Sequence, residues 1–306
     1  MDVAALGYVV IDATNPEDWA RFGTNIMGLS AHAATGGMAL RMDERAGRLF
    51  VQKSDANRFA ACGWEVRSEA DFARAQALLK ARDIPFIQAT RDECALRHVF
   101  DMVWFTDPSG NRHELALGYV SPFEVFNSPT GVSGFVTGDL GLGHAVLPAP
   151  NIAATRNFLA DVLGLGLSDI LIHRPLWPGG PEQRIDFLHC ANGRHHSLAL
   201  FEGAVPSGCV HLMVEVATLD DVGRAYDRMQ SSGVRLMATL GKHTNDHMTS
   251  FYFESPGSFA IEYGFGGRTL DWDRHTVFES TSVSLWGHDF SVGFGADEAK
   301  QLAEAA

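Results

Sequence analysis

The chain has 306 residues, of which 46% are hydrophobic and 20% charged, enough for two domains with apolar cores. A net charge of −13 argues against nucleic acid or an anionic membrane as a partner, because clustered Lys and Arg bind both. No apolar run approaches the roughly 18 residues of a membrane helix, and the N-terminal residues lack the features of a signal peptide.

The first half of the chain opens with a predicted strand and helix in residues 6–29, LGYVVIDATNPEDWARFGTNIMGL. A second strand at Ala61–Val66 precedes a predicted helix at Asp71–Lys80. The half closes on FTDPSGNRHELALG, which begins at Phe105. Ser, Pro and Gly then gather in SPFEVFNSPTGVSG, and this composition predicts a linker near residues 120–140.

The second half repeats this order. Residues 142–165, LGHAVLPAPNIAATRNFLADVLGL, match residues 6–29 at a constant spacing of 136, with Gly, Asn and Gly at corresponding places. FESPGSFAIEYG, from Phe253, parallels FTDPSGNRHELALG at a spacing of 148, which aligns Glu114 with Glu262. Such internal repeats predict that the two halves are structural duplicates.

Each half is itself expected to be double. His144 opens an apolar strand that a helical pattern follows from Asn151 to Val162, and His211 opens another, followed by a helical pattern from Leu219 to Met229. The two strand histidines are 67 residues apart, and apolar residues of the two helices share this spacing. We therefore expect an α+β fold of four β-α-β-β-β modules, paired two per domain. The expected limits are 1–133 and 134–291 for the domains and 292–306 for a variable polar tail.

Two histidines and one glutamate of the second half are expected to converge on a metal ion. His144 and His211 open equivalent strands, Glu262 lies on a last strand, and equivalent strands meet in a paired module. Two imidazoles and one carboxylate around an open face are typical of non-haem iron(II) oxygenases, whereas structural zinc sites favour four ligands, usually with thiolate. The cysteines form no CxxC pair and are expected to be reduced in a cytoplasmic protein: Cys62, Cys94, Cys190 and Cys209.

The first half lacks this ligand set. The corresponding positions are Tyr8, Ala61 and Glu114, so one ligand of three is retained, and we predict a metal-free structural copy. The alternative interpretation is that His144 and His211 are buried strand histidines that bond only to backbone. The shared spacing, and the absence of histidine from the first-half positions, favour the metal site.

Five stretches of the sequence resemble the type I extradiol ring-cleaving dioxygenases of the vicinal oxygen chelate superfamily: GLGHAVL, FLHCANGRHHSLAL, VHLMVEV, LGKHTNDHMTSFYFESPGSFAIEYG and SLWGHDF. With the N-terminal half, the resemblance covers essentially the whole chain. It implies a glyoxalase-like fold and an Fe(II) cofactor on His144, His211 and Glu262, with Mn(II) as the alternative ion. The implied reaction is cleavage of a catechol by O₂ to a 2-hydroxy-6-oxo-dienoate, in a homo-oligomeric enzyme.

The resemblance also implies roles for residues beside the metal. His196, the second histidine of RHHSL, matches the acid–base histidine of the family. Tyr252 and His243 match residues that hydrogen-bond substrate or oxygen-derived intermediates. On a strand, His195 would point away from His196, so we expect a structural role for it.

A bulky substituted catechol is the expected substrate, with the 2,3-dihydroxybiphenyl type favoured and secosteroid or fused bicyclic catechols left open. Asn245 and Asp246 lie in the HxND segment that forms the active-site wall in the family. Val146 and Phe187 are candidates for an apolar pocket, although core packing explains them nearly as well. Substrate choice is expected to depend on LIHRPLWPGGPEQ, Leu171–Gln183.

Two other functions of the same fold are considered. A glyoxalase-like metal isomerase generally uses four protein ligands and needs no RHHSL histidine, so His196 and Tyr252 argue against it. A non-catalytic binding protein commonly lacks the metal ligands, so the intact set of three argues against that function.

Overall fold

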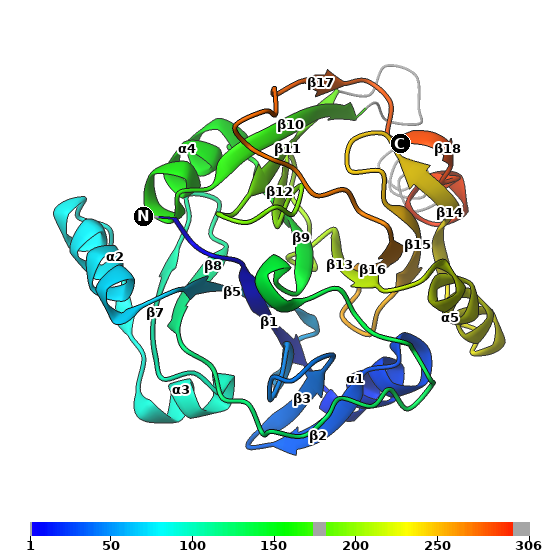
Figure 1. Ribbon diagram of the computed structural model, residues 1–306, viewed down its shortest axis with the longest axis horizontal. Coiled ribbons are helices and arrows are strands. Elements are labelled where there is room, and N and C mark those ends of the chain that lie inside the picture. The colour runs from blue at the N-terminus through cyan, green and yellow to red at the C-terminus, as the bar shows by residue number, and fades with distance from the viewer. Residues whose placement is uncertain (1, 174–181, 296–306) are drawn as a thin grey trace.

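The computed structural model describes residues 2–173 and 182–295 and confirms the predicted α+β fold of four modules (Figure 1). The first module contains β1 (Leu6–Ala13), α1 (Pro16–Phe22), the π-helix η1 (Gly23–Met27), β2 (Ser30–Ala34), β3 (Gly37–Arg41) and β4 (Leu49–Lys53). The second contains β5 (Arg58–Val66), α2 (Glu69–Ala81), β6 (Ile87–Gln88), α3 (Arg91–Arg97), β7 (Asp101–Thr106) and β8 (Arg112–Leu117). The short helix α3 is therefore an addition to the predicted order.

The second half repeats the first after the short helix η2 (Gly138–Leu140). Its first module contains β9 (Gly143–Pro148), α4 (Ile152–Leu163), β10 (Gly166–His173), β11 (Gln183–His189) and β12 (Leu198–Phe201). Its second contains β13 (His211–Val216), α5 (Leu219–Ser231), β14 (Leu236–His243), β15 (Thr249–Glu254) and β16 (Ala260–Phe265). The elements β17 (Glu279–Ser280), β18 (Ser284–Gly287) and η3 (Phe290–Val292) follow.

The asparagine and glycine residues that repeat between the halves mark helix boundaries. The Asn151 side chain accepts a hydrogen bond from the Ala154 N–H at the start of α4, and Gly164 ends that helix with φ 72°. Asn15 and Gly28 hold the same places around α1 and η1, where Gly28 has φ 79°. Asparagine favours helix starts, and glycine adopts the left-handed conformation without a steric penalty. The repeat thus preserves the residues that delimit each first helix.

Each half forms one sheet with the same pattern of pairing. The strand orders are β2-β3-β4-β1-β5-β8-β7-β6 and β17-β10-β11-β12-β9-β13-β16-β15-β14-β18. In the second sheet β9 and β13 are antiparallel neighbours, and each is flanked by the parallel last strand of its own module, β12 or β16. Because β1, β5, β4 and β8 pair in the same way, the opening strands of both modules meet in each half.

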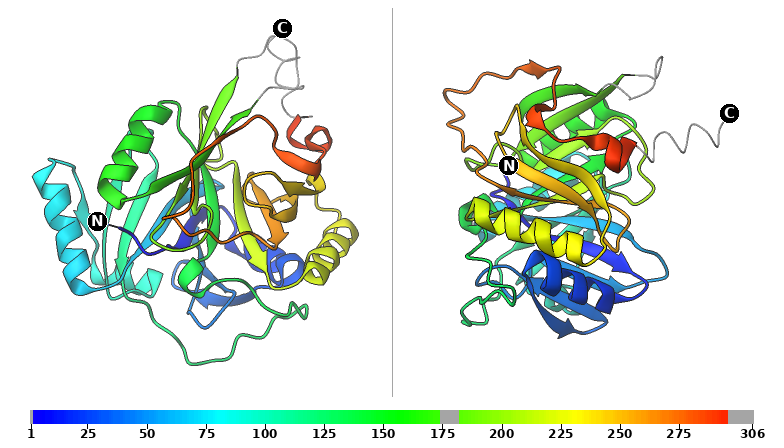
Figure 2. Two further views of the ribbon diagram at one scale, coloured as in Figure 1. Left: turned by 45° about the horizontal axis from the view of Figure 1, so that its top comes forward. Right: turned by 90° about the vertical axis from the view of Figure 1, so that its right-hand side faces the viewer.

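The two halves share one apolar core, with helices on the outer side of the strands (Figure 2). Helix α2 contacts α4, and η1 contacts α5, so each contact joins elements of different halves. Aromatic rings also cross this boundary: Trp19 lies 5.6 Å from Phe259, and Phe22 lies 5.6 Å from Phe253, between ring centroids. The two halves therefore pack against each other through this shared core.

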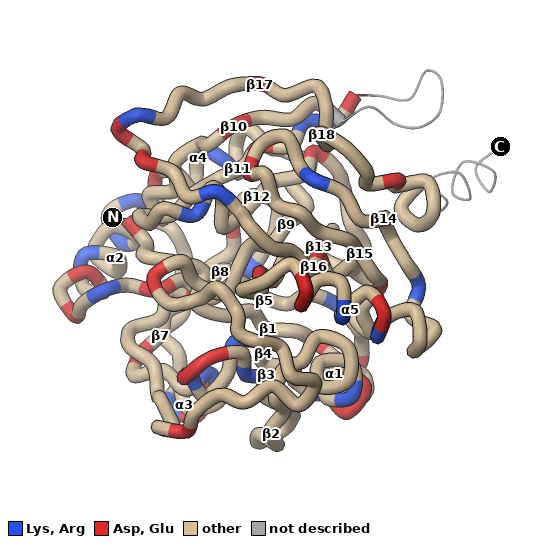
Figure 3. The backbone as a smooth tube through the Cα atoms, turned by 45° about the vertical axis from the view of Figure 1, so that its right-hand side comes forward, with Lys and Arg blue, Asp and Glu red and all other residues tan. Residues whose placement is uncertain are grey.

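Charged residues are mixed along the chain. Basic and acidic segments alternate in Figure 3, and no extended basic run is visible in that view. Within residues 2–173 and 182–295, no helix combines the length and apolar character that a membrane span requires.

The four cysteines are buried and free. The domain limits near residues 133 and 291 stay predictions.

Candidate metal centre

Strand register brings His144, His211 and Glu262 to one face of the second sheet. His144 on β9 lies opposite Met213 on β13, and Met213 lies opposite Glu262 on β16. His211 precedes Met213 by two residues, so its side chain shares that face. The approach of β13 to β9 requires glycine beside His144, because a Cβ at Gly143 would lie 2.1 Å from the Met213 carbonyl oxygen.

The donor atoms of these three side chains converge. His144 Nε2 lies 3.1 Å from His211 Nε2, and both nitrogens lie 3.2 Å from Glu262 Oε2. Adjacent ligands about 2.1 Å from an octahedral ion are about 3 Å apart, so the set fits one metal ion with an open face. His144 and Glu262 are 2% and 1% exposed, whereas His211 is more accessible. The donor set is thus mostly buried, and His211 is its most accessible member.

The second carboxylate oxygen of Glu262 is held by protein groups. The Ser250 hydroxyl donates to Oε1 at 2.7 Å, and His243 Nε2 lies 3.2 Å from the same atom. Burial would raise the pKa of Glu262, but hydrogen bonds from His144, His211 and His243 hold it well below its usual range. Burial is also the main cause of the lowered pKa of His144. The pKa directions thus favour a carboxylate at Glu262 and a neutral imidazole at His144, the forms that bind metal.

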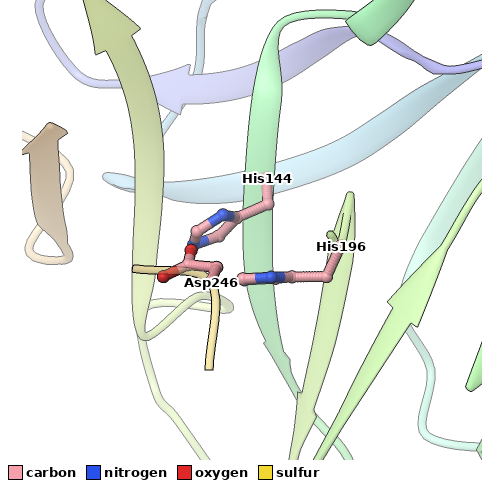
Figure 4. Close-up of side chains that lie close together, drawn as sticks. All are labelled: His144, His196 and Asp246. Atoms are coloured by element: carbon pink, nitrogen blue, oxygen red, sulfur yellow. The ribbon is translucent and has the colours of Figure 1, made fainter. Parts of the chain in front are cut away.

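His196 lies against this set. Its ring centroid is 3.9 Å from that of His144, and its buried Nε2 has no hydrogen-bond partner within the described structure (Figure 4). Burial first, and then the neighbouring charges of His144 and His195, hold the pKa of His196 well below its usual value. The prediction that His195 points away from His196 is wrong. Strand β12 begins only at Leu198, and the two Nδ1 atoms lie 3.0 Å apart.

Tyr252 and His243 approach the centre from the side of Glu262. Tyr252 on β15 lies directly opposite Glu262 in the sheet, and its hydroxyl is 2.7 Å from His243 Nε2. Burial opposes a charge on His243, but the Glu262 carboxylate raises its pKa to about 9. His288 received no role from the sequence. Its ring centroid lies 4.2 Å from that of His243, and its Nε2 lies 3.1 Å from the Ser250 carbonyl oxygen.

The predicted apolar residues occupy one row of the sheet beside the metal ligands. Val146 lies opposite His211 on one side and Ala199 on the other, and Ala199 lies opposite Phe187. The Phe187 ring meets the His196 ring edge-on at 4.8 Å. Both apolar residues thus lie beside the centre, and their contact with a substrate stays a prediction.

Asn245 and Asp246 form a buried turn close to the ligands. Asn245 Oδ1 accepts a hydrogen bond from the Asp246 N–H, and Asp246 Oδ1 accepts one from Met248. An Asp246 oxygen also lies within 4.8 Å of ligand nitrogens of His144 and His196 (Figure 4). Of the predicted substrate-selecting segment, residues 174–181 lie outside the described residues, as does the tail from residue 296.

The first half has different side chains at the positions equivalent to the three metal ligands. Tyr8 lies opposite Gly63, which lies opposite Glu114, so the register places Tyr8, Ala61 and Glu114 as His144, His211 and Glu262 are placed. The Tyr8 hydroxyl donates to Glu114 at 2.8 Å. Guanidinium groups of Arg97 and Arg112 lie 3.1 and 2.8 Å from the same carboxylate.

Arginine charge thus compensates Glu114 where a metal would compensate Glu262. Within the described ranges, both groups of side chains that could share a metal lie in the second half.

Known protein families match a segment of each half of the chain. Residues 141–263 match the family described as Glyoxalase/Bleomycin resistance protein/Dioxygenase superfamily, and residues 6–53 match Dihydroxybiphenyl dioxygenase BphC D1. An iron-dependent extradiol dioxygenase of Rhodococcus jostii is 39% identical over 96% of this chain and 99% of its own length. A biphenyl-2,3-diol 1,2-dioxygenase of Paraburkholderia xenovorans is 38% identical over 94% and 96%.

Solved structures agree. A halotolerant catechol dioxygenase superposes with a TM-score of 0.87 at 34% identity, covering 94% of this chain and 95% of that one. The 2,2′,3-trihydroxybiphenyl 1,2-dioxygenase of Sphingomonas wittichii superposes with a TM-score of 0.83 at 33% identity, covering 94% and 99%. Such relatives imply a catalytic metal, and the described His-His-Glu group fits one.

Proposed function

The chain belongs to the extradiol dioxygenases of the glyoxalase/bleomycin resistance protein/dioxygenase superfamily, and from this membership we propose that it cleaves a bulky catechol with O₂ at iron(II). The convergence of His144, His211 and Glu262, with the His196 ring against them, carries the proposal. Cleavage falls beside the two hydroxyls and gives a 2-hydroxy-6-oxo-dienoate. The 2,3-dihydroxybiphenyl type is favoured among the possible substrates.

Iron(II) is proposed on the donor set, with Mn(II) as the ion that the same ligands would accept. Bound iron would pass electron density from the aromatic ring to O₂, which otherwise reacts slowly with closed-shell molecules. His144, His211 and Glu262 would hold the ion and keep one of its faces open. Ser250 and His243 would fix the orientation of the Glu262 carboxylate through Oε1.

His196 is proposed as the group that takes a proton from a catechol hydroxyl. Its Nε2 is buried beside His144 and has no protein partner in the described part of the chain, so the lone pair is available to a bound substrate. The protonated ring could later return that proton to an oxygen leaving the reacting centre. One histidine can serve both steps near neutral pH.

Tyr252 and His243 are proposed as hydrogen-bond donors to substrate or to oxygen-derived groups. Their contact of 2.7 Å fixes the phenol on the Glu262 side of the centre. Val146 and Phe187 would pack on the ring of the substrate, and Asn245 and Asp246 would form the polar wall. This division matches a substrate with an apolar ring and two adjacent hydroxyls.

The direct test mixes anaerobically purified, Fe(II)-loaded protein with 2,3-dihydroxybiphenyl and then admits air. A yellow product and consumption of one O₂ per catechol are expected. Failure with a panel of monocyclic and bicyclic catechols, by protein shown to contain iron, would contradict the proposal. A cytoplasmic location, a homo-oligomeric state and the absence of nucleic-acid or membrane partners stay predictions from the sequence.

A further inference from the structure

Asp169 on β10 is a fully buried carboxylate that lacks the partners such a group needs. Neither of its oxygens accepts a hydrogen bond within the described structure, although His195 Nε2 lies 3.4 Å from Oδ2. A buried charge without partners is costly, and native proteins rarely keep one without a role. Asp186, on the neighbouring strand, shows the ordinary solution: Arg156 and Arg184 both pair with it.

A chain of three side chains leads from Asp169 to the metal centre. His195 contacts Asp169 through Nε2 and places Nδ1 3.0 Å from His196 Nδ1. His196 then presents its unpartnered Nε2 beside His144. The Ser168 hydroxyl donates to the His195 carbonyl at 2.5 Å and fixes the segment that carries both histidines.

The carboxylate decides which nitrogens carry protons. As a carboxylate, Asp169 can only accept a hydrogen bond, and the nearest ring nitrogen is His195 Nε2 at 3.4 Å, so this arrangement favours the His195 proton on Nε2. A neutral His195 then has its lone pair on Nδ1 and can only accept from His196. His196 therefore carries its proton on Nδ1, which leaves the lone pair on Nε2.

We propose that Asp169 and His195 are positioning residues that hold His196 in the Nδ1–H tautomer, with the Nε2 lone pair directed at the catechol hydroxyl. This inference rests on the proposed role of His196 as the base. When Nε2 takes the substrate proton, the imidazolium that forms donates through Nδ1 to His195, and the Asp169 charge stabilises the pair.

The test is a double-mutant cycle on the iron-loaded enzyme with 2,3-dihydroxybiphenyl. In Asp169→Asn the amide can donate to His195 Nε2, which inverts both tautomers. We expect kcat to fall by roughly 10²–10³, as wrong-tautomer variants of catalytic histidines do, with KM and iron content within about two-fold. In a His196→Gln background the same substitution should lower kcat by less than about three-fold. An undiminished loss in that background would overturn the proposal.

The control is Asp186→Asn, which removes a buried carboxylate of the same sheet from its arginine pairs. It should lower the melting temperature and leave kcat within about two-fold, because Asp186 neighbours Phe187 and so points to the opposite face.

A second readout does not depend on turnover. Imidazole ¹⁵N shifts of zinc-loaded, histidine-labelled wild-type protein should assign a protonated Nδ1 to His196 and a protonated Nε2 to His195. The opposite assignment would overturn the proposal even if Asp169→Asn fails to fold. Loss of catechol cleavage by the wild type would contradict the proposed function and leave this measurement valid.

Discussion

His211 and His196 lie at the same centre in different positions, so their substitutions should fail differently. His211→Ala removes a donor atom and should lose both metal and activity. His196→Gln removes the proposed base alone, so it should keep about one metal per chain while kcat falls roughly 10²–10⁴-fold. Metal analysis and turnover of the same samples separate the two. Equal metal loss in both variants would contradict these roles.

Single residues could be predicted where a repeat supplied a comparison. His144, His211 and Glu262 stand out because their first-half equivalents are Tyr8, Ala61 and Glu114, and the strand register bears out this equivalence. Ser250 had no such signal, although it shares a face of β15 with Tyr252 and bonds Glu262. His288 reaches the centre from beyond β18, and sequence spacing carries no information on such a return.

At the level of elements, helices that carry boundary residues could be predicted well. The predicted helices lie within two residues of α2, α4 and α5 at each end. His195 and His196 were expected to lie on a strand, but β12 begins only at Leu198. The expected orientation of the His195 side chain was therefore wrong. The helix α3 and the π-helix η1 were not predicted either, since neither recurs in the second half.

The π-helix η1 contacts the second half through the carbonyl groups of its last two residues, Ile26 and Met27. The Tyr263 hydroxyl donates to the Met27 carbonyl at 2.9 Å, and Arg228 Nε donates to Ile26 at 2.9 Å. Tyr263→Phe leaves the Met27 carbonyl without this donor and should lower the free energy of unfolding by about 1 kcal/mol. Metal content should not change, because Tyr263 points to the face opposite Glu262.

Urea denaturation of the metal-free protein measures this loss. Tyr226→Phe is the matched control, since the Tyr226 ring packs on Phe251 at 5.0 Å, and it should stay within about 0.5 kcal/mol of wild type. Equal stability of Tyr263→Phe and wild type would show that this contact does not join the halves.

On the scale of the whole molecule, the described metal-ligand set lies in one of the two duplicated halves, and both halves share one apolar core. The sequence could predict the four modules, because they follow from internal spacing, and the absence of metal from the first half stays a prediction. It could not predict how the halves pack, because residues such as Arg228 and Trp19 make those contacts outside the repeated pattern.

The first half of the chain should contribute to the stability of the fold through the buried ion pairs around Glu114. Arg97→Met leaves the buried Glu114 with fewer partners and should cost about 3 kcal/mol of unfolding free energy. Metal stoichiometry should stay at one per chain. Arg58→Met is the control, because its pair with Asp12 is largely exposed on the arginine side and should cost less than about 1 kcal/mol. A harmless Arg97→Met would contradict the structural role of this cluster.

Anomalous diffraction from iron-loaded crystals tests the central claim most directly, because it locates the metal independently of activity. One iron peak per chain is predicted, bounded by His144 Nε2, His211 Nε2 and the Glu262 carboxylate, with none beside Tyr8 and Glu114. A peak in the first half, or an active enzyme with no metal between the three second-half ligands, would contradict the assignment of a single working centre to one of two duplicated halves.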